Sequence, residues 1–388
     1  MNIALVLTQK FDPHAGGVQR TTSKLAKIYE AKKHQVIIVS YGNHTTSEQE
    51  YEGIKLFYVN QKEESQLKEI FHSQEIDCII NQMGFSLELT KLLLKVKPRD
   101  TKIINTLRIN PLNFYDNHKN TLKDFFERKK IGFLNTYITR KIILAYHIFR
   151  QNVELGFIVK NTDAFVMLSE KFKPELLFLV PKLKKYLHKI HGIGNPFQRP
   201  ELDIKTLPKE NIVVYVGSLN IRQKRVDLLL EIWEKLHAQS PDWKFWVLGE
   251  GPEKKNMEEF CKKNNLDRIH FFGNVNPNDY YKKAKIFHMT SAFEGFGNVL
   301  IEAQSYGCVP MLFDSYSAAS DIVYHNENGI LVQPFDCNEY AAETKKLMDN
   351  PEKTSELALN AYENVLRFSY EETYKKWEKV FEFLRKKY

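Results

Sequence analysis

Cysteine is scarce in this chain, and its few cysteines do not stand in pairs. Among 388 residues there are four, at Cys78, Cys261, Cys308 and Cys337, and no two of them form a C-x-x-C motif. A disulfide framework or a zinc site would show cysteines at short, regular spacings. The sequence therefore predicts buried free thiols in a chain that works in a reducing cytoplasm.

Signals for membrane spanning and export are also missing. No run of 18 or more uncharged apolar residues occurs, so we expect no transmembrane helix. The N-terminal segment MNIALVLTQK has no basic region before its apolar run and no small-residue cleavage site. This pattern is typical of a first β-strand and not of a signal peptide.

The first half of the chain has few acidic residues for its many basic ones. Residues 1–195 hold 30 Lys and Arg against 19 Asp and Glu, a net charge of +11, and the rest hold 26 against 29, a net −3, which together give the +8 of the chain. A basic half beside a nearly neutral half indicates that the first half meets an anionic partner. Phospholipid headgroups, a lipid-linked diphosphate and nucleic acid all fit that description.

Short apolar runs alternate with helical patterns along the chain, without low-complexity tracts or short repeats. This alternation predicts an α/β fold in which helices wrap parallel sheets. In the first half we expect strands at 3–7, 36–39, 76–81, 102–107 and 164–168. In the second half we expect strands at 212–216, 244–248, 269–272, 286–289 and 309–313, and helices at 226–238, 253–264, 277–283, 298–306 and 337–348.

The most informative segment is SAFEGFGNVLIEA, at residues 291–303, in which Glu294 and Glu302 stand eight positions apart. The pattern predicts a glycine-rich loop that turns into a helix. Glycines allow positive φ and a close approach of the backbone to a ligand. Free N–H groups at the helix start attract phosphate. Glu294 on the loop and Glu302 in the helix can accept hydrogen bonds from hydroxyls on either side of such a phosphate.

This segment resembles the E-x7-E signature of retaining glycosyltransferases with the GT-B fold, in the large family 4. In that family the first glutamate binds hydroxyls of the donor sugar and the second binds the ribose of the nucleotide. The resemblance assigns these roles to Glu294 and Glu302. It implies two Rossmann-like domains that face a cleft, and a nucleotide-sugar held by the loop and helix start, at Gly295, Phe296, Gly297, Asn298 and Val299.

A basic segment, VGSLNIRQKRVDL at residues 216–228, resembles the family's G-R-L-x-x-x-K-G/R-x-D-x-L-L motif. There the Arg and the Lys hold the donor diphosphate, and fixed cations stabilise the negative charge that grows as this group leaves. Lys224 matches the family's Lys directly. Ser218 replaces the usual Arg and the loop is one residue longer, so we expect Arg222 to supply the second cation. A solvated basic turn is the alternative.

Three further segments complete the expected donor site. Gly16 and Gly17 match the family's Gly-Gly loop, which faces the donor phosphates. Gly249 lies in a turn that resembles the family's G-x-G-P, and Asn274 and Val275 follow a strand end where main-chain groups commonly meet the base. No D-x-D triplet occurs, so the metal-chelating diphosphate site of GT-A enzymes has no candidate here. We therefore expect no metal and no cofactor.

The acceptor side is less defined. Many family members place a His near residue 107, close to the donor sugar, but the segment TLRIN at residues 106–110 has none. Arg108 and Asn110 from this segment, or His14 and His118 from loops, are the candidates, and the sequence does not choose among them.

Residues 118–151 are rich in Lys and Arg, interleaved with large apolar side chains. A segment of this kind can lie in a membrane interface, or it can cover the core of the first domain with its cations in water. Both interpretations stay open. Nucleic-acid binding is not expected, because no nucleic-acid-binding module is recognised.

Together these observations predict a cytoplasmic retaining glycosyltransferase, and leave open whether it is peripheral to the inner face of the cell membrane. It would move a sugar from a nucleotide-sugar, favoured to be a UDP-sugar, to a glycan or lipid-linked acceptor in bacterial surface polysaccharide biosynthesis. The expected domains are an acceptor-binding one at 1–200, joined by a C-terminal helix at 366–388, and a nucleotide-sugar-binding one at 201–365. Two alternatives remain: a non-catalytic sugar-nucleotide or glycan-binding partner of another transferase, and another GT-B activity such as an epimerase.

Overall fold

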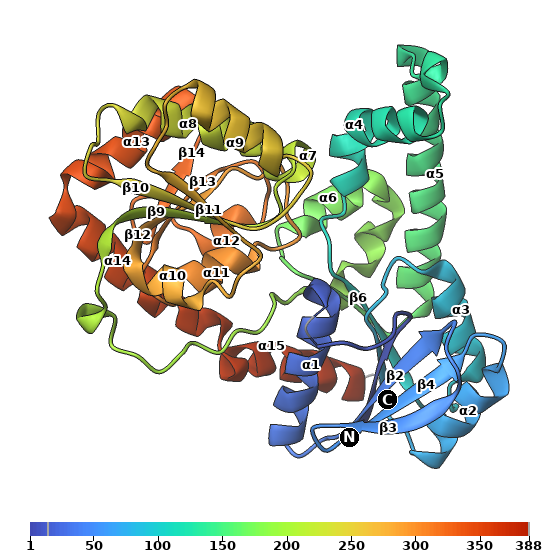
Figure 1. Ribbon diagram of the computed structural model, residues 1–388. Helices are drawn as coiled ribbons and strands as arrows, with labels where there is room; N and C mark the ends of the chain where they lie inside the picture. The colour runs from blue at the N-terminus through green and yellow to red at the C-terminus, as the bar shows by residue number, and fades with distance from the viewer. Residues whose placement is uncertain (14, 387–388) are drawn as a thin grey trace. The chain divides into compact units, whose positions relative to one another are not determined.

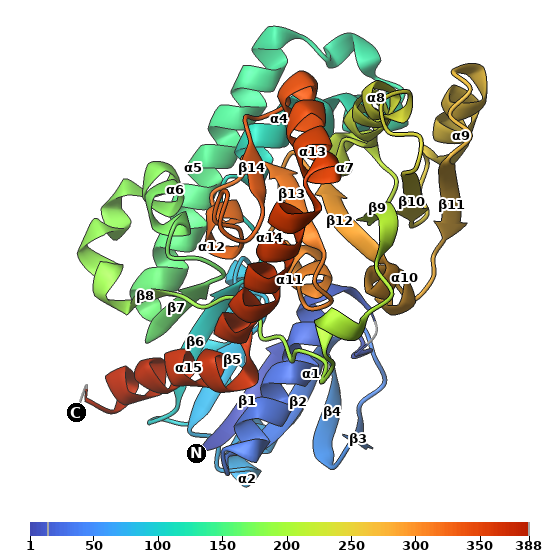
Figure 2. The ribbon, with the colours of Figure 1, turned by 90° about the vertical axis from the view of Figure 1, so that its left-hand side faces the viewer.

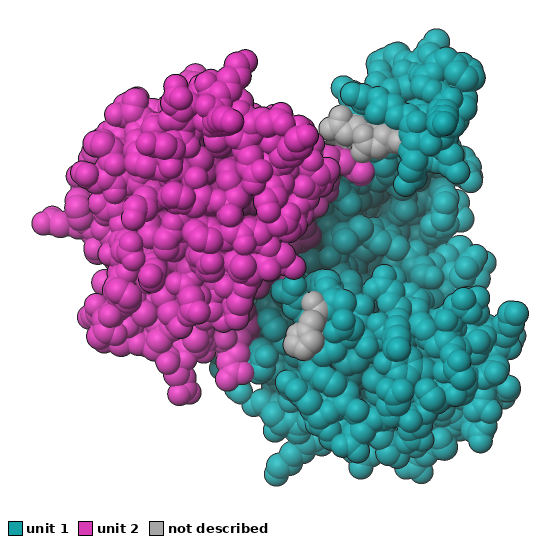
Figure 3. Space-filling view, in the orientation of Figure 1, with its two compact units in different colours: residues 1–196, 370–388 teal, residues 197–369 magenta. Residues whose placement is uncertain are grey.

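The computed structural model describes residues 1–13 and 15–386, and the chain divides into two compact units. Unit 1 comprises Met1–Pro196 with Tyr370–Tyr388, and unit 2 comprises Phe197–Ser369 (Figure 3). Both of the domain boundaries expected from the sequence, at 200/201 and at 365/366, lie four residues from these.

Unit 1 is built on an eight-stranded sheet in the order β3-β4-β2-β1-β5-β6-β7-β8. Neighbouring strands are parallel, except that β3 runs antiparallel to β4. The order reverses between β1 and β5, from which the chain builds the sheet outward in both directions. The strands are β1 (Asn2–Leu7), β2 (Gln35–Gly42), β3 (Ser47–Tyr51), β4 (Ile54–Asn60), β5 (Cys78–Asn81), β6 (Lys102–Leu107), β7 (Ala164–Met167) and β8 (Ile190–Gly192).

Helices cover both faces of this sheet, because its central strands are apolar on both sides. In β1, Ile3 and Leu5 pack into the core under α1 and α15, whereas Ala4 and Val6 pack into the core under α2 and α3. The helices are α1 (Gly16–Ala31), α2 (Glu64–Ser73), α3 (Leu87–Val96), α4 (Asn113–Arg128), α5 (Tyr137–Asn161), α6 (Phe172–Leu179) and α15 (Tyr370–Arg385), with 3-10 helices η1 (Gly132–Leu134) and η2 (Pro181–Lys189).

The last helix, α15, lies beside α1, although the two are separated by most of the sequence (Figures 1 and 2). Its aromatic stripe makes the contact. Trp377 is fully buried, and its ring centroid lies 5.9 Å from that of Tyr29 on α1. At the edge of the same contact, Lys32 pairs with Glu371 at 2.6 Å. The C-terminal helix is therefore part of the hydrophobic core of unit 1.

Unit 2 is built on a six-stranded parallel sheet in the order β11-β10-β9-β12-β13-β14. Helices α8, α9 and α13 cover one face, and α10 and α11 cover the other (Figure 1). Helix α14 adds Leu357 to the core under α8 and α13 and also contacts α11. The strands are β9 (Glu210–Val216), β10 (Lys244–Leu248), β11 (Ile269–Gly273), β12 (Ala284–Met289), β13 (Val309–Phe313) and β14 (Ile330–Val332).

The longer helices of unit 2 are α8 (Val226–His237), α9 (Lys254–Lys263), α10 (Asn278–Lys283), α11 (Asn298–Gln304), α13 (Cys337–Asp349) and α14 (Pro351–Asn364). Shorter ones are α7 (Ile221–Lys224), α12 (Ala319–Ile322) and the 3-10 helices η3 (Ile204–Thr206) and η4 (Val365–Phe368). In the part of the chain that the structure describes, no helix has both the length and the apolar character needed to cross a membrane.

The prediction of α/β architecture is confirmed, and the sheet interiors were predicted more closely than the edges. The expected strands at 102–107, 244–248 and 309–313 coincide with β6, β10 and β13. The sequence analysis missed β3, β4, β8 and β14. Strands β8 and β14 have three residues each, and β3 is exposed at four of its five residues, so neither length nor apolar periodicity marks them. Strand β4 was missed although its sequence is apolar.

The contact between α15 and α1 yields a stability prediction. Trp377→Ala should lower the free energy of unfolding by about 3–5 kcal/mol, because it removes a fully buried aromatic side chain and leaves a cavity. Urea unfolding of the full-length chain measures this. The matched control on the same helix is Lys379→Ala, an exposed position that should change stability by less than about 0.5 kcal/mol. Equal effects of the two changes would show that α15 is not part of the core.

Candidate functional site

The order of the strands in unit 2 creates a switch point between β9 and β12. From β9 the chain proceeds to β10 and β11 on one side, and from β12 it proceeds to β13 and β14 on the other. At such a point the loops that follow the two strands diverge and leave a crevice at the carboxyl end of the sheet, where ligands of open α/β sheets bind. Both expected motifs, residues 216–228 after β9 and 291–303 after β12, begin here.

The loop after β9 is fixed by an asparagine cap. The Asn220 side chain accepts hydrogen bonds from the backbone N–H groups of Gln223 and Lys224, at 2.8 and 3.3 Å, and so caps the short helix α7. Its amide also donates to Ser218 Oγ at 2.8 Å. Helix α7 ends where Arg225 takes a left-handed conformation, with φ 47°, and pairs with Asp227. The side chain of Lys224 is thereby held at the end of a rigid turn.

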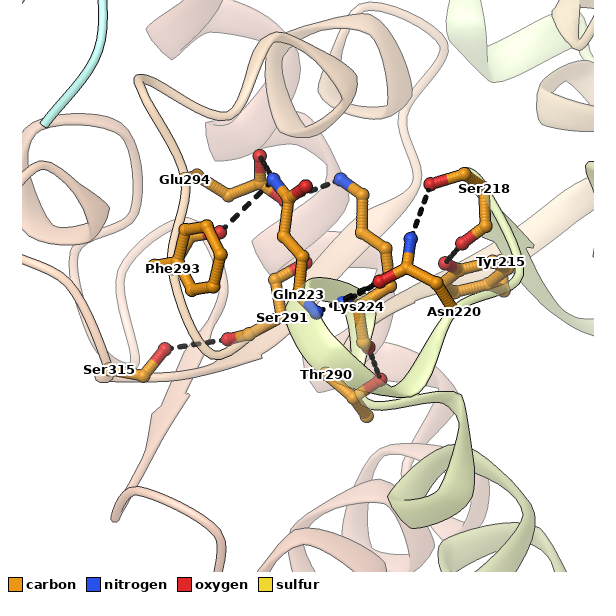
Figure 4. Close-up of polar contacts among 10 residues, drawn as sticks. All are labelled: Tyr215, Ser218, Asn220, Gln223, Lys224, Thr290, Ser291, Phe293, Glu294 and Ser315. Atoms are coloured by element: carbon orange, nitrogen blue, oxygen red, sulfur yellow. Dashed lines mark hydrogen bonds and ion pairs between the residues drawn. The ribbon is translucent and has the colours of Figure 1, made fainter. Parts of the chain in front are cut away.

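The two motifs meet in an ion pair. Lys224 Nζ lies 2.5 Å from Glu294 Oε1, and only 13% and 11% of the two side chains are exposed (Figure 4). Gln223 Nε2 donates to the other carboxylate oxygen, Glu294 Oε2, at 3.3 Å and lies 3.4 Å from Phe293 O. Both oxygens of Glu294 thus have donors from α7. The sequence predicted that both charged residues face the site, but not that they contact each other.

Glu294 also affects two buried phenols. Burial, and after it the charge of Glu294, raises the pKa values of Tyr215 and Tyr316 well above the ordinary range. Tyr215 donates to Ser218 O at 3.0 Å, whereas the hydroxyl of Tyr316 and that of Ser291 have no hydrogen-bond partner among the described residues. Both phenols are therefore neutral groups near the negative charge of Glu294.

Backbone contacts hold the loop after β12 against α7. Ala292 N donates to Gln223 O at 2.7 Å, and Thr290 Oγ1 donates to Lys224 O at 2.8 Å. At the end of the loop, Gly297 has φ 96° and is the residue before α11. A Cβ atom at this position would lie 2.6 Å from the Tyr316 hydroxyl, so glycine is required by both conformation and space.

The two glycines of the loop differ in backbone conformation. Gly295 does not take positive φ, in contrast to Gly297. Val299 is half-buried, and the buried run of α11 begins one residue later, at Leu300. Asn298 and Val299, the first two residues of α11, are both half-buried.

A second glycine turn lies next to the β9 loop. Gly249 has φ 143°, and a Cβ atom there would lie 1.8 Å from Gly217 O. Its N–H donates to Gly273 O at 2.7 Å, which links the ends of β10 and β11. Asn274 and Val275 follow this link and are exposed. The turn therefore packs backbone against backbone and presents the residues after β11 to solvent at the carboxyl edge of the sheet.

The remaining residues expected in unit 2 differ in how far they are exposed. Ser218 and Arg222 are exposed, on the β9 loop and on α7. Glu302 is half-buried on α11, where its charge, after burial, contributes to raising the pKa of Tyr281. Phe296 is buried, and its ring packs edge-on against that of Phe368, with ring centroids 5.8 Å apart. Its side chain therefore anchors the loop in the core of unit 2.

The residues expected in unit 1 are mostly engaged within that unit. Arg108 donates to Gln82 at 3.2 Å and to Asn195 at 3.4 Å, and burial lowers its pKa to about 10. Asn110 accepts a hydrogen bond from Leu112 N, and His118 Nδ1 lies 2.6 Å from Tyr115 O within α4.

Helix α1 begins at Gly16, with φ 65°, and a Cβ atom added at Gly16 or at Gly17 would meet no atom within 4 Å. The space around these two Cβ positions is therefore open. His14 lies outside the described residues. Within the described residues, no group of three or more His, Cys, Asp or Glu side chains is placed to hold a metal ion.

The sequence analysis missed Asn220 and Gln223, which position Lys224 and Glu294. A signal for Asn220 was available, because Asn is a preferred residue before a helix. Nothing marked Gln223, since a glutamine within a basic turn has no distinctive pattern. Tyr316 was also missed, because its role depends on the spatial proximity of Gly297.

Comparison with known proteins identifies the type of domain that carries this site. Residues 198–364 match the model of the family described as glycosyl transferases group 1. The amylovoran biosynthesis glycosyltransferase AmsD of Erwinia amylovora is 31% identical over 205 residues, which are 50% of this chain and 56% of that protein. An uncharacterized glycosyltransferase of Haemophilus influenzae is 26% identical over 87% of this chain and 88% of its own length.

Two more similarities bear on ligands. A diphospho-undecaprenol 4-alpha-N-acetylgalactosaminyltransferase of Campylobacter jejuni is 32% identical over 155 residues, 39% of this chain and 41% of that protein. Among solved structures, Anabaena HepE in complex with UDP and glucose superimposes with a TM-score of 0.69 at 15% identity, over 98% of this chain and 99% of that one. At this identity the superposition establishes the fold, which is GT-B.

The asparagine cap yields a prediction that does not depend on a ligand. Asn220→Ala should destabilise the protein by about 1 kcal/mol, because two backbone N–H groups of α7 lose their acceptor. Asn220→Asp keeps an acceptor at the same place and should restore most of this stability. Chemical unfolding followed by tryptophan fluorescence measures both variants. If Ala and Asp behave alike, the cap does not hold α7.

Proposed function

We propose that the chain is a retaining glycosyltransferase that uses a UDP-sugar, because residues 198–364 match the glycosyl transferases group 1 and the fold is GT-B. The observation that carries the proposal is the contact between Lys224 and Glu294 at the switch point of unit 2. It joins a fixed cation, suited to a diphosphate, with a fixed carboxylate, suited to sugar hydroxyls, in one place.

Lys224 is proposed to hold the diphosphate. An ammonium has three N–H donors, and among the described residues Glu294 is the acceptor that contacts Lys224 Nζ, so two donors remain for phosphate oxygens. Arg222, exposed two residues earlier on α7, is the second cation. Together they would stabilise the negative charge that develops on the leaving diphosphate. Such electrostatic stabilisation is strongest where solvent is excluded.

The two glutamates are proposed to bind the two ends of the donor. Gln223 and Lys224 fix the plane of the Glu294 carboxylate, whose remaining lone pairs can accept from the hydroxyls of the donor sugar. Glu302, on α11, would accept from the ribose hydroxyls. The backbone of Gly295, Gly297 and the start of α11 would contact the phosphates, and Gly249, Asn274 and Val275 would line the base.

The transfer proceeds with retention in this proposal. As the bond between the anomeric carbon and the phosphate oxygen breaks, the acceptor oxygen bonds to the same face of that carbon. The acceptor hydroxyl gives its proton to an oxygen of the departing diphosphate, and the products are UDP and the glycoside. The proton therefore needs no enzymatic base, and the residues of unit 2 supply orientation and charge.

The acceptor is proposed to be a glycan or a lipid-linked glycan in bacterial surface polysaccharide biosynthesis. The names of the relatives from Erwinia and Campylobacter support this class. Arg108, Asn110, His118 and the open start of α1 at Gly16 and Gly17 are the candidates for contacts on unit 1. Four free, buried cysteines agree with work in the cytoplasm.

A screen of nucleotide-sugars by thermal shift tests the proposal as a whole. A UDP-sugar at a hundred times its dissociation constant should stabilise the protein by about 2.7 kcal/mol. A chain that binds UDP-sugars but releases no UDP with any glycan acceptor would be a binding partner of another transferase. Stabilisation by none of the nucleotide-sugars would reject the proposal.

Replacing the two glutamates should change the affinity for UDP in different ways. Glu302→Gln should weaken UDP by roughly tenfold or more, since a hydrogen bond to a charged group contributes about 1.5–3 kcal/mol. Glu294→Gln should leave the affinity for UDP unchanged or raise it, because it removes a competitor for Lys224, and should weaken the UDP-sugar relative to UDP. Isothermal titration calorimetry of both ligands with both variants measures this. Unchanged UDP affinity in folded Glu302→Gln would refute the ribose assignment.

Metal independence is a further prediction. The proposed leaving-group chemistry uses Lys224 and Arg222, and the sequence offers no D-x-D. Turnover, measured as release of UDP, should therefore be the same with and without EDTA. Loss of turnover in EDTA that Mn²⁺ or Mg²⁺ restores would contradict the role given to these cations.

A further inference from the structure

Unit 1 carries a helical arm whose apolar side chains face solvent. The arm consists of α4, η1 and α5, residues 113–161, and extends past the sheet of its own unit (Figure 1). At its tip, in and next to η1, Phe133 is 78% exposed and Tyr137 is 66% exposed. Side chains of this size are normally buried, and a contiguous group of them on a surface marks an interaction site.

The exposed residues continue as a stripe along α5. Ile138, Ile142, Tyr146, Phe149 and Val153 have exposures of 70, 64, 64, 67 and 47%. They follow one another at spacings of four, four, three and four residues, which places them on one face of a helix. We call these five residues the apolar stripe.

The opposite side of α5 makes the contacts that hold the arm. Leu144, Leu155 and Ile158 are buried. Phe114 of α4 stacks on His147 of α5, with ring centroids 3.8 Å apart. The core of unit 1 is thus covered by residues other than the stripe. The sequence left open whether this segment covers the core or faces a partner, and among the described residues the stripe stays 47–70% exposed.

The charges of the arm indicate the chemistry of that partner. Residues 118–151 contain eight Lys and Arg but only two Asp and Glu. Lys141 lies beside the stripe, with its ammonium 5.5 Å from the Tyr137 ring, and Lys129 and Lys130 are exposed at the end of α4. A second copy docked on the same stripe would bring two such basic arms together. An anionic surface, in contrast, neutralises the cations while it buries the stripe.

We propose that the arm docks the chain on the anionic lipid leaflet of a membrane, with the stripe in the interface and the flanking cations at the headgroups. An amphipathic helix with aromatic and branched residues on one face and Lys or Arg beside them binds membranes in this way. The electrostatic part is screened by salt within a Debye length. The part that comes from the stripe is not.

The role of the docking rests on the proposed function, whereas the docking itself does not. If the acceptor is lipid-linked, an enzyme held at the leaflet meets it by diffusion in two dimensions. The arm would then increase transfer to a membrane-embedded acceptor and would leave the affinity for the nucleotide unchanged, because the stripe lies in unit 1 and the Lys224–Glu294 pair in unit 2.

Flotation of the full-length chain with vesicles tests the proposal. The probes are vesicles of phosphatidylcholine alone and of phosphatidylcholine mixed with phosphatidylglycerol. We expect binding to the mixed vesicles that decreases with salt but does not vanish, and at least tenfold weaker binding to the neutral ones. Failure to float with mixed vesicles even at low salt would overturn the proposal.

Two sets of variants separate the two contributions. The stripe variant, with Ile138→Ser, Ile142→Ser and Phe149→Ser, should lose the salt-resistant binding. The charge variant, with Lys129→Ser, Lys130→Ser, Arg140→Ser and Lys141→Ser, should lose most of the salt-sensitive binding.

The matched control removes four exposed lysines elsewhere in unit 1, with Lys62→Ser, Lys68→Ser, Lys184→Ser and Lys185→Ser, and should bind as the wild type does. Stripe and control variants that bind equally would overturn the proposal. So would a dimer in sedimentation velocity that the stripe variant converts to a monomer, because it would assign the stripe to a second copy.

Calorimetry with UDP on the same proteins distinguishes this inference from the proposed function. All variants of the arm should bind UDP with the wild-type affinity. A wild type that floats with anionic vesicles but binds no nucleotide would uphold the docking and reject the transferase proposal. A wild type that binds UDP but does not float with anionic vesicles would reject the docking and leave the transferase proposal standing.

Discussion

The candidate site depends on one interaction, the ion pair between Lys224 and Glu294. The two residues come from loops after adjacent strands and are 70 positions apart in the sequence. Both side chains are largely removed from water, and a charge in such a place is strongly destabilising unless it is paired and hydrogen-bonded. The surrounding contacts meet this requirement: Asn220 fixes the turn that carries Lys224, and Gln223 donates to the second oxygen of Glu294.

The same pair supports the proposal that the site binds a ligand with a diphosphate and hydroxyls. Removing two charges from water is costly, so a protein that only needed stability could place apolar residues here. A ligand with phosphate oxygens could accept from the remaining N–H donors of Lys224. Its hydroxyls could donate to the remaining lone pairs of Glu294. The phenols of Tyr215 and Tyr316 are buried near Glu294 and stay neutral, so they add no charge that would compete with it.

Most of the fold and part of the site could be predicted from the sequence. Buried parallel strands read as apolar runs, so β6, β10 and β13 were located at their observed bounds, whereas the edge strand β3 carries no apolar signal. Lys224 and Glu294 were found because their neighbours resemble known motifs. Their contact with each other, and the positioning roles of Asn220 and Gln223, depend on three-dimensional proximity that spacing does not encode. The sequence also could not show which face of α5 is buried, because both faces of that helix carry large apolar side chains.

The central claim of the proposal is that Lys224 holds the diphosphate of the donor, through its β-phosphate, and is not merely a structural partner of Glu294. Calorimetric titration of the wild type and of Lys224→Met with UDP and with UMP tests it most directly, since the two ligands differ only in that phosphate. The account predicts that Lys224→Met weakens UDP by roughly tenfold or more, in line with about 1.5–3 kcal/mol for a charged hydrogen bond, and changes UMP affinity far less. An equal loss for both ligands, in a variant that unfolds cooperatively, would contradict the account, because it would show that Lys224 supports the site as a whole without contacting the β-phosphate.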